Sequence, residues 1–167
     1  MADDGTGHNT AAPRAVDANP GRAYRPSFDP DRVGPYEAGI DAIEPQRIAA
    51  VLARYGERFL SRIFTPAERE ICRERVNSLA ARFAAKEAVA KVLGTGLGTI
   101  AWREIEILAN ERGRPVLVLH GVAAARAAHL GLRHWSVSLT HLAGLALALV
   151  VAGAAPTPQE CEYEVVP

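Results

Sequence analysis

The sequence of 167 residues carries no net charge, because its 19 Lys and Arg residues are balanced by 19 Asp and Glu residues. Without a basic excess we expect no nucleic-acid partner, and any charged partner must be recognised by a local patch. Long apolar runs are also absent. The most apolar stretch, residues 142–155, is shorter than the ~20 residues that a membrane-spanning helix needs. It predicts a buried strand, and we expect no membrane partner.

Cysteine is nearly absent, with only Cys72 and Cys161 in the chain. Two isolated cysteines form neither a disulfide framework nor a zinc site, so we expect two free thiols in a reducing compartment. The first ten residues, MADDGTGHNT, lack the basic and apolar segments of a secretory signal. These absences together predict a cytoplasmic protein.

Apolar periodicity is missing from both ends of the chain. Residues 1–35 are rich in Gly, Pro, Ala, Asp and Arg, and such a composition cannot bury enough surface to offset the entropy of ordering. Residues 155–167 are similar in character and include three glutamates. We predict a disordered N-terminal arm over 1–35, one domain over 36–154 and a flexible tail over 155–167.

The first half of the domain predicts a short strand and then helices. Residues 39–43 form the strand, with Asp41 on its polar side. Apolar residues at helical spacing predict a helix from Pro45 to at least Phe59. A second helix begins at the capping box of residues 65–68.

A third helix is rich in alanine and is followed by strands. It begins near Asn77 or Ser78 and ends where Gly94 can adopt a left-handed conformation. The later residues predict a hairpin, a short helix and two strands. Helices early and antiparallel strands late define an α+β fold. The first predicted strand contains Trp102, Ile105 and Ile107, and the second covers residues 115–119. A helix is predicted over 122–131, and two further strands over 135–140 and 145–151.

The third helix carries the residues most suggestive of chemistry. Phe83, Glu87 and Lys91 are four residues apart and share one stripe of the helix. An exposed Glu–Lys pair at this spacing, worth roughly 0.2–0.5 kcal/mol, is the simpler interpretation. The alanines on the other faces indicate close packing all round. Glu87 would then be partly buried and would need a partner or a cation.

Two other features have two interpretations each, and a third is a stripe of arginines. The glycine-rich residues 94–98 could cradle a phosphate or only cap the helix, since they match no phosphate-binding fingerprint. His141, with Ser138 and Thr140 before it, could bind an anion or simply be exposed. One helical stripe of arginines by itself indicates a solvated face; it contains Arg47, Arg54, Arg58 and Arg62.

Several sequence blocks occur in a distinctive order. Residues 39–44 read G-I-D-A-I-E, residues 82–91 read R-F-A-A-K-E-A-V-A-K and residues 138–141 read S-L-T-H. Residues 113–115 read G-R-P, and residues 64–68 read F-T-P-A-E. With these blocks the chain resembles the holo-[acyl-carrier-protein] synthase group of 4′-phosphopantetheinyl transferases. The long arm ahead of the first block and the acidic tail depart from that pattern.

The resemblance implies a reaction and a set of site residues. The family transfers phosphopantetheine from coenzyme A to a serine of an apo carrier protein and releases adenosine 3′,5′-bisphosphate. Asp41 and Glu87 would bind Mg²⁺, with Mn²⁺ as a substitute, and two carboxylates plus a substrate phosphate are a common Mg²⁺ ligand set. Glu87 and Lys91 would be catalytic. Coenzyme A would contact Lys86, Lys91, Gly94, Thr95, Gly96, Gly113, Arg114, Pro115, Thr140 and His141.

Two of these roles keep alternatives. Lys86 could bind the 3′-phosphate of coenzyme A or could serve the structure. The base that accepts the serine proton could be Glu87, a carboxylate of the carrier, or water oriented by the metal site, which we favour. A non-catalytic carrier-binding module is the rival function, although it would have no need for the metal pair.

The resemblance also implies partners. Acyl carrier proteins are acidic, and the family docks them on basic residues of its first helix, here Arg47, Arg54 and Arg58. A domain of this length without an internal repeat fits the short members of the family, which assemble as homotrimers with active sites between subunits. The carrier could belong to fatty acid biosynthesis or to a secondary pathway.

Overall fold

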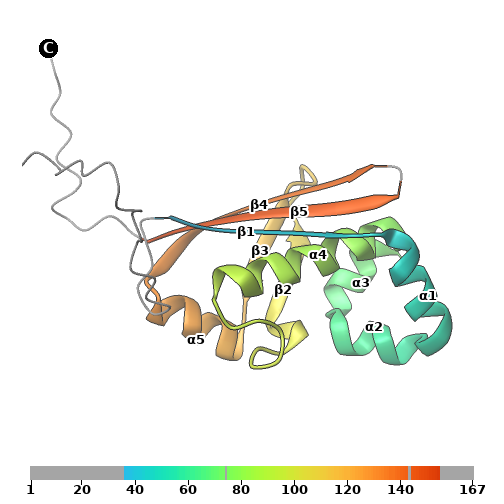
Figure 1. Ribbon diagram of the computed structural model, residues 1–167, viewed down its shortest axis with the longest axis horizontal. Coiled ribbons are helices and arrows are strands. Elements are labelled where there is room, and N and C mark those ends of the chain that lie inside the picture. Colours follow the sequence, from blue (N-terminus) through green and yellow to red (C-terminus); the bar gives the residue numbers. More distant parts are fainter. Residues whose placement is uncertain (1–35, 74, 143, 155–167) are drawn as a thin grey trace, which may run out of the picture.

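A three-stranded antiparallel sheet packed against one long helix forms the centre of the molecule (Figure 1). This computed structural model describes residues 36–73, 75–142 and 144–154. The predicted arm, the predicted tail and Cys161 lie outside these residues. The sheet has the order β1-β5-β4, and its strands are β1 (Tyr36–Ile43), β4 (Leu132–Leu142) and β5 (Leu145–Ala154). The helix is α4 (Val76–Val92).

Alternation along β5 determines which face of the sheet α4 covers. Ala146, Ala148, Val150 and Ala152 are fully buried on the inner face, whereas Leu149 on the outer face is exposed. Small side chains on both elements let the helix approach the sheet closely. The prediction that α4 is packed on all sides is confirmed, because its alanines at 80, 81, 84, 85, 88 and 90 are all buried.

Three short helices precede α4: α1 (Pro45–Tyr55), α2 (Glu57–Ile63) and α3 (Pro66–Cys72). The prediction of one helix from Pro45 to Phe59 is wrong, since Gly56 has a φ of 48° and breaks it into α1 and α2. The break leaves Tyr55 about half exposed. The capping box is confirmed: Thr65 Oγ1 accepts a hydrogen bond from the Glu68 amide, and the Glu68 carboxylate accepts one from the Thr65 amide.

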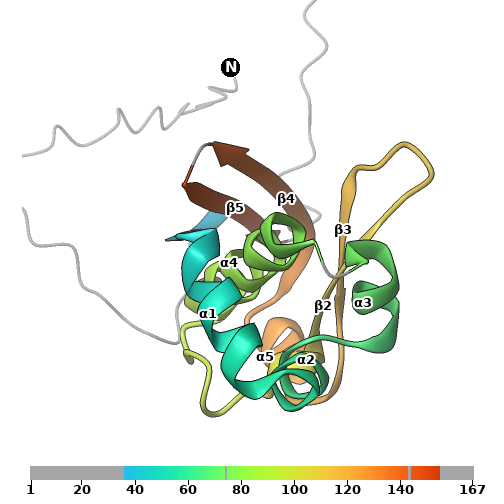
Figure 2. The same cartoon turned by 90° about the vertical axis from the view of Figure 1, so that its right-hand side faces the viewer.

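A two-stranded hairpin flanks α4, with β3 next to β4 of the sheet (Figure 2). It pairs β2 (Ile105–Ala109) with β3 (Pro115–Leu119), as predicted. Trp102 was expected in a strand but lies in the 3-10 helix η1 (Trp102–Glu104). Helix α5 (Gly121–His129) leads into β4. The α+β class is confirmed, and no helix among the described residues is long and apolar enough to cross a membrane.

Candidate active site

Asp41 comes close to α4 because a glycine lies on the same face of β1. Gly39, Asp41 and Ile43 alternate onto the face that meets the helix. A Cβ added at Gly39 would lie 2.1 Å from the carbonyl oxygen of Ala88, so a side chain there would prevent the contact. The close contact brings Asp41 beside Glu87, the residue that precedes Ala88.

Lys91 joins the two elements. Its Nζ donates to Asp41 Oδ1 at 2.9 Å and to the carbonyl oxygen of Ile40 at 2.7 Å. The simpler interpretation of the sequence was a surface pair between Glu87 and Lys91. Instead, Lys91 forms its ion pair with Asp41 on β1. Its charge therefore lies beside two carboxylates that are 46 residues apart in the sequence.

The pKa of Glu87 is affected by the charges beside it. Partial burial raises its pKa, the nearby Asp41 carboxylate raises it further, and Lys91 partly opposes both effects. Two carboxylates that repel each other in a partly desolvated place favour a proton or a cation between them. The arrangement is therefore suited to hold positive charge.

Both carboxylates line a cavity of about 380 Å³ between β1, α1, α2 and α4. Arg47 contributes a positive charge to the wall. The remaining wall is mostly apolar and includes Ile48, Val51, Phe59 and Phe83. A polar end beside an apolar end is a common design for a site that binds an extended organic molecule.

Carboxylate oxygens are the ligands that Mg²⁺ prefers, and Mg²⁺ usually takes only one or two of them together with water and substrate phosphates. Asp41 and Glu87 fit that pattern. The described residues contain no group of three or more His, Cys, Asp or Glu side chains that could enclose a metal. A cation at this place would thus depend on a phosphate substrate to complete its ligands.

Lys86 has no access to this cavity or to solvent. Its side chain is fully buried, and its Nζ is 2.8 Å from Glu68 Oε2. Burial lowers the pKa of Lys86, and the Glu68 carboxylate opposes this effect. The prediction that Lys86 contacts coenzyme A is therefore not supported by the geometry, and its structural alternative fits. Glu68, whose tertiary role the sequence did not reveal, is its partner.

His141 lies in a different cavity, of about 520 Å³, at the N-terminus of α4. The other lining residues are Arg75, Val76, Asn77 and Ser78, none of which the motifs had singled out. Thr140 points to the opposite face of the sheet, because neighbouring strand residues alternate. The structure does not bring His141 or Thr140 to the two carboxylates within one chain.

The glycine loop and the hairpin turn also lie outside the carboxylate cavity. Gly94 and Gly96 have φ values of 69° and 65°, so the predicted left-handed end of the helix is confirmed. Arg126 of α5 braces the loop, donating from Nε to the carbonyl oxygen of Leu93 at 3.2 Å. At the hairpin tip, Gly113 and Arg114 are exposed at the end of the turn, and Pro115 is the half-buried first residue of β3.

The predicted carrier-binding arginines occupy two helices. Arg47 and Arg54 belong to α1 and Arg58 to α2, and all three are exposed. The Arg54 guanidinium lies 5.3 Å from the centre of the Tyr55 ring. Only Arg47 lines the carboxylate cavity.

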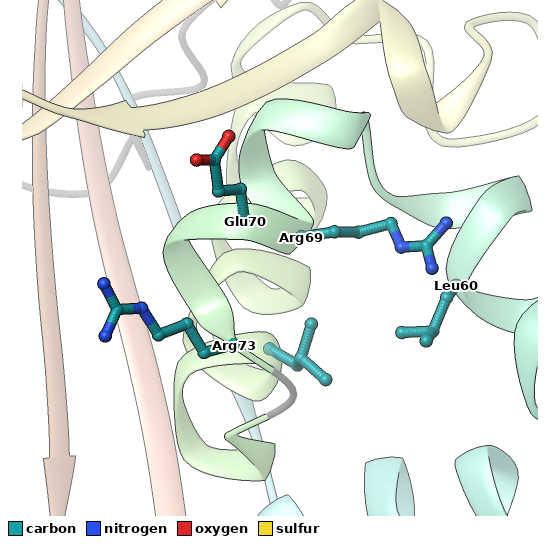
Figure 3. Close-up of a pocket in the computed structure, with 5 residues that line it drawn as sticks. Leu60, Arg69, Glu70 and Arg73 are labelled. Carbon is teal, nitrogen blue, oxygen red and sulfur yellow. The ribbon is translucent and has the colours of Figure 1, made fainter.

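Another cavity, of about 520 Å³, lies among α2, α3 and α4 (Figure 3). Its lining includes Leu60, Arg69, Glu70 and Arg73. Arg69 is already engaged, because its two terminal nitrogens each lie 2.7 Å from an oxygen of Glu57. No residue of the predicted site lines this cavity.

The chain is similar to known proteins of one family. A model of the 4′-phosphopantetheinyl transferase superfamily matches residues 37–150. A holo-[acyl-carrier-protein] synthase of Herpetosiphon aurantiacus is 51% identical over 120 residues, covering 68% of this chain and 94% of the relative. One from Dehalococcoides mccartyi strain CBDB1 is 52% identical over 114 residues, covering 68% of this chain and 95% of the relative.

Solved structures show the same likeness. The Helicobacter pylori holo-[acyl-carrier-protein] synthase in complex with coenzyme A has a TM-score of 0.65 and 31% identity, covering 70% of this chain and 99% of that one. The enzyme from Neisseria meningitidis has a TM-score of 0.63 and 36% identity, covering 70% and 96%. The chain therefore belongs to the 4′-phosphopantetheinyl transferase superfamily. Within it the chain groups with the holo-[acyl-carrier-protein] synthases, and it is an enzyme, a phosphopantetheinyl transferase.

Proposed function

We propose that this enzyme transfers 4′-phosphopantetheine from coenzyme A to a serine of an apo acyl carrier protein in a Mg²⁺-dependent reaction. The serine Oγ forms a bond to the phosphorus that carries pantetheine. The bridging P–O bond of the pyrophosphate breaks, adenosine 3′,5′-bisphosphate leaves with the bonding electrons, and the serine proton passes to water. The observation that carries the proposal is the pairing of Asp41 and Glu87 beside one cavity.

The residues of the site have complementary roles in this reaction. Asp41 and Glu87 would hold Mg²⁺, and the cation would neutralise negative charge that develops on the leaving phosphate. Lys91, held by Asp41 and the Ile40 carbonyl, keeps a second positive charge at the same place. The apolar wall excludes water from one side of the cavity, which strengthens these electrostatic interactions.

The carrier would dock on the arginines of α1 and α2. Arg47, Arg54 and Arg58 are exposed, and Arg47 also reaches the wall of the carboxylate cavity. An acidic partner bound along these helices would therefore present its serine near Asp41 and Glu87. Such charges act mainly on the rate of association and on its salt dependence. The cytoplasmic location expected from the sequence stays a prediction.

We also propose that the active form is a homotrimer. In the described part of the chain, no helix covers the outer face of the β1-β5-β4 sheet (Figure 1). Large apolar side chains are exposed on that face, and exposed apolar area of this kind marks an interface. They are Tyr36, Ile40, Leu142, Leu145 and Leu149.

The position of His141 gives independent support to a site shared between subunits. Its cavity includes Val76 at the start of α4, and Glu87 is eleven residues further along. At 1.5 Å per residue that separation is about 16 Å along the helix axis. A second subunit could place its own His141 near the carboxylates of the first, which one chain alone does not do.

The proposal is tested by incubating the enzyme with coenzyme A, Mg²⁺ and a panel of apo carriers from fatty acid and secondary pathways. We expect at least one carrier to gain one phosphopantetheine, with kcat/KM values that rank the carriers. If no carrier in the panel is modified, while another holo-[acyl-carrier-protein] synthase modifies them all, the proposed function is wrong.

A further inference from the structure

We infer that the buried ion pair between Glu68 and Lys86 fixes the rotation of α4 about its axis and thereby places Glu87 beside Asp41. Both members of the pair are fully buried, and they come from different helices, α3 and α4. The inference deepens the proposed function and rests on it, because the role of Glu87 is proposed there. Glu68 and Lys86 therefore act as positioning residues.

The polar groups of the pair are fully engaged. Lys86 Nζ donates to Glu68, to the carbonyl oxygen of Trp102 at 3.0 Å and to that of Ile105. An ammonium group has three donors, so none is left for a ligand. Glu68 accepts from the backbone amides of Thr65 and Ile107, each at 2.9 Å. The pair therefore joins α3, α4, η1 and β2.

Stability alone does not explain such a pair. Replacing a buried ion pair by apolar residues of similar volume is often neutral or stabilising, so its net contribution to folding is small. The pair instead supplies directional bonds. These matter for α4, because six of its eleven buried residues are alanines, and such small side chains by themselves hold the rotation of a helix only weakly.

A second cationic side chain on α4 contacts the same strand. Arg82 lies one turn before Lys86, on the same stripe of the helix. Its Nε donates to the carbonyl oxygen of Ile107 at 2.9 Å. Two anchors on one stripe hold that side of α4 against β2.

Glu87 follows Lys86 directly and therefore points about 100° further round the helix. With Lys86 fixed towards β2, Glu87 faces β1 and the cavity that it shares with Asp41. Loss of the anchor would let α4 rotate and would separate the two carboxylates. A displacement of about 1 Å can reduce a reaction rate about 100-fold.

The test uses the double variant Glu68→Gln/Lys86→Met, which removes both charges and keeps the side-chain volumes similar. Leu130→Ala, at the end of α5, is the control, because it removes a buried side chain outside α4 and its anchors. A second variant, Arg82→Gln, removes the other anchor and keeps the ion pair. All are measured below the onset of unfolding, as judged by circular dichroism.

The first readout is the affinity for Mn²⁺ in the presence of coenzyme A, measured by electron paramagnetic resonance of the free ion. We expect a 10- to 100-fold loss in the double variant, the range typical for groups that orient metal ligands. A smaller loss is expected for Arg82→Gln and none for Leu130→Ala. The KM for the carrier should stay unchanged while kcat falls.

The inference is overturned if the double variant binds Mn²⁺ as tightly as the wild type, or if Leu130→Ala weakens binding equally. If the double variant does not fold, Arg82→Gln is compared with the wild type instead. Equal affinity of these two proteins for Mn²⁺ would then overturn the inference. Failure of the wild type to modify any carrier would reject the proposed function, whereas the Mn²⁺ comparison would still test the positioning role separately.

Discussion

Gly39 of β1 lies so close to Ala88 of α4 that a Cβ on the glycine would be 2.1 Å from the Ala88 carbonyl oxygen. The backbone of Ala88 cannot yield as a flexible side chain would, because its carbonyl belongs to the interior of a helix. The contact therefore couples the packing of the sheet to the position of Asp41, two residues further along β1. Structure and candidate chemistry depend on the same glycine.

We predict that Gly39→Ala destabilises the protein by about 1–3 kcal/mol or more, the usual cost of overpacking a core. The variant should also lose transferase activity, because β1 must move away from α4 and carry Asp41 with it. Urea denaturation measures the first effect. Gly98→Ala is the stability control, since a Cβ there meets no atom within 4 Å. Equal stability of the two variants would contradict the packing argument.

Glu87→Gln should have opposite effects on stability with and without Mg²⁺. The pKa of Glu87 is raised, which means that its ionised form is disfavoured in the folded protein at neutral pH. Without metal the variant should therefore have a higher Tm than the wild type. Mg²⁺ with adenosine 3′,5′-bisphosphate should raise the Tm of the wild type and of the control Glu57→Gln, but not that of Glu87→Gln. A metal-dependent rise in Glu87→Gln would argue against its role as a ligand.

Arg54→Glu should raise the KM for the carrier roughly tenfold or more at low salt, since charge steering changes association rates by this order. The KM for coenzyme A should not change. Arg103→Glu, an exposed arginine in η1, should leave both constants unaltered. Steady-state kinetics at two salt concentrations measure these effects. Equal increases in both KM values would rule out a docking role for Arg54.

Glu106 gives a prediction about pH. Burial alone would raise its pKa, but hydrogen bonds from Thr65 and His120 and the charge of His120 outweigh this effect, so the pKa is lowered. A carboxyl group of this kind stabilises the folded state above the ordinary glutamate pKa of about 4.3 and loses that contribution as the pH falls through the lower folded value.

Glu106→Gln should consequently be less stable than the wild type at neutral pH, and the difference should narrow as the pH falls below about 4.3. Denaturation curves across this range measure the difference, with Glu111→Gln, exposed at the hairpin turn, as the control. A difference that does not change with pH would show that Glu106 acts through its shape and not through its charge.

Leu149→Lys should convert the proposed homotrimer into monomers, because it places a charge in the centre of the apolar outer face of the sheet. The residue is 41% exposed in a single chain. Light scattering at micromolar concentration measures the assembly. Val122→Lys, an exposed apolar residue on α5, should remain trimeric. A monomeric wild type would refute the trimer itself.

The sequence predicted local structure well wherever all the residues that form it are close together in the chain. The capping box of Thr65 and Glu68 needs only neighbouring residues, and both of its hydrogen bonds are present. The hairpin of β2 and β3 likewise follows from alternation around a turn. Gly56 was missed as a helix break because the apolar period continues through it, while its φ of 48° interrupts the backbone.

Residues of the site that meet only in the folded protein were predicted only where a family motif contained them. Resemblance paired Asp41 with Glu87, but it also grouped Lys86 with the phosphate ligands. No local pattern shows that a lysine in the middle of a helix points inwards to Glu68, eighteen residues away. The sequence predicted Glu68 only as part of the capping box. Its contacts with Lys86 and Ile107 arise from tertiary packing, which no local pattern shows. The cavity around His141 was missed for the same reason.

Intact-mass spectrometry of an apo acyl carrier protein is the decisive measurement for the Mg²⁺-dependent transfer by Glu87. The carrier is incubated with coenzyme A and Mg²⁺ and either the wild type or Glu87→Gln, with and without a chelator. We expect only the wild type with Mg²⁺ to add one phosphopantetheine and to release an equal amount of adenosine 3′,5′-bisphosphate. Labelling by Glu87→Gln in the presence of the chelator, or no labelling by the wild type of a carrier that a related synthase modifies, would contradict this expectation.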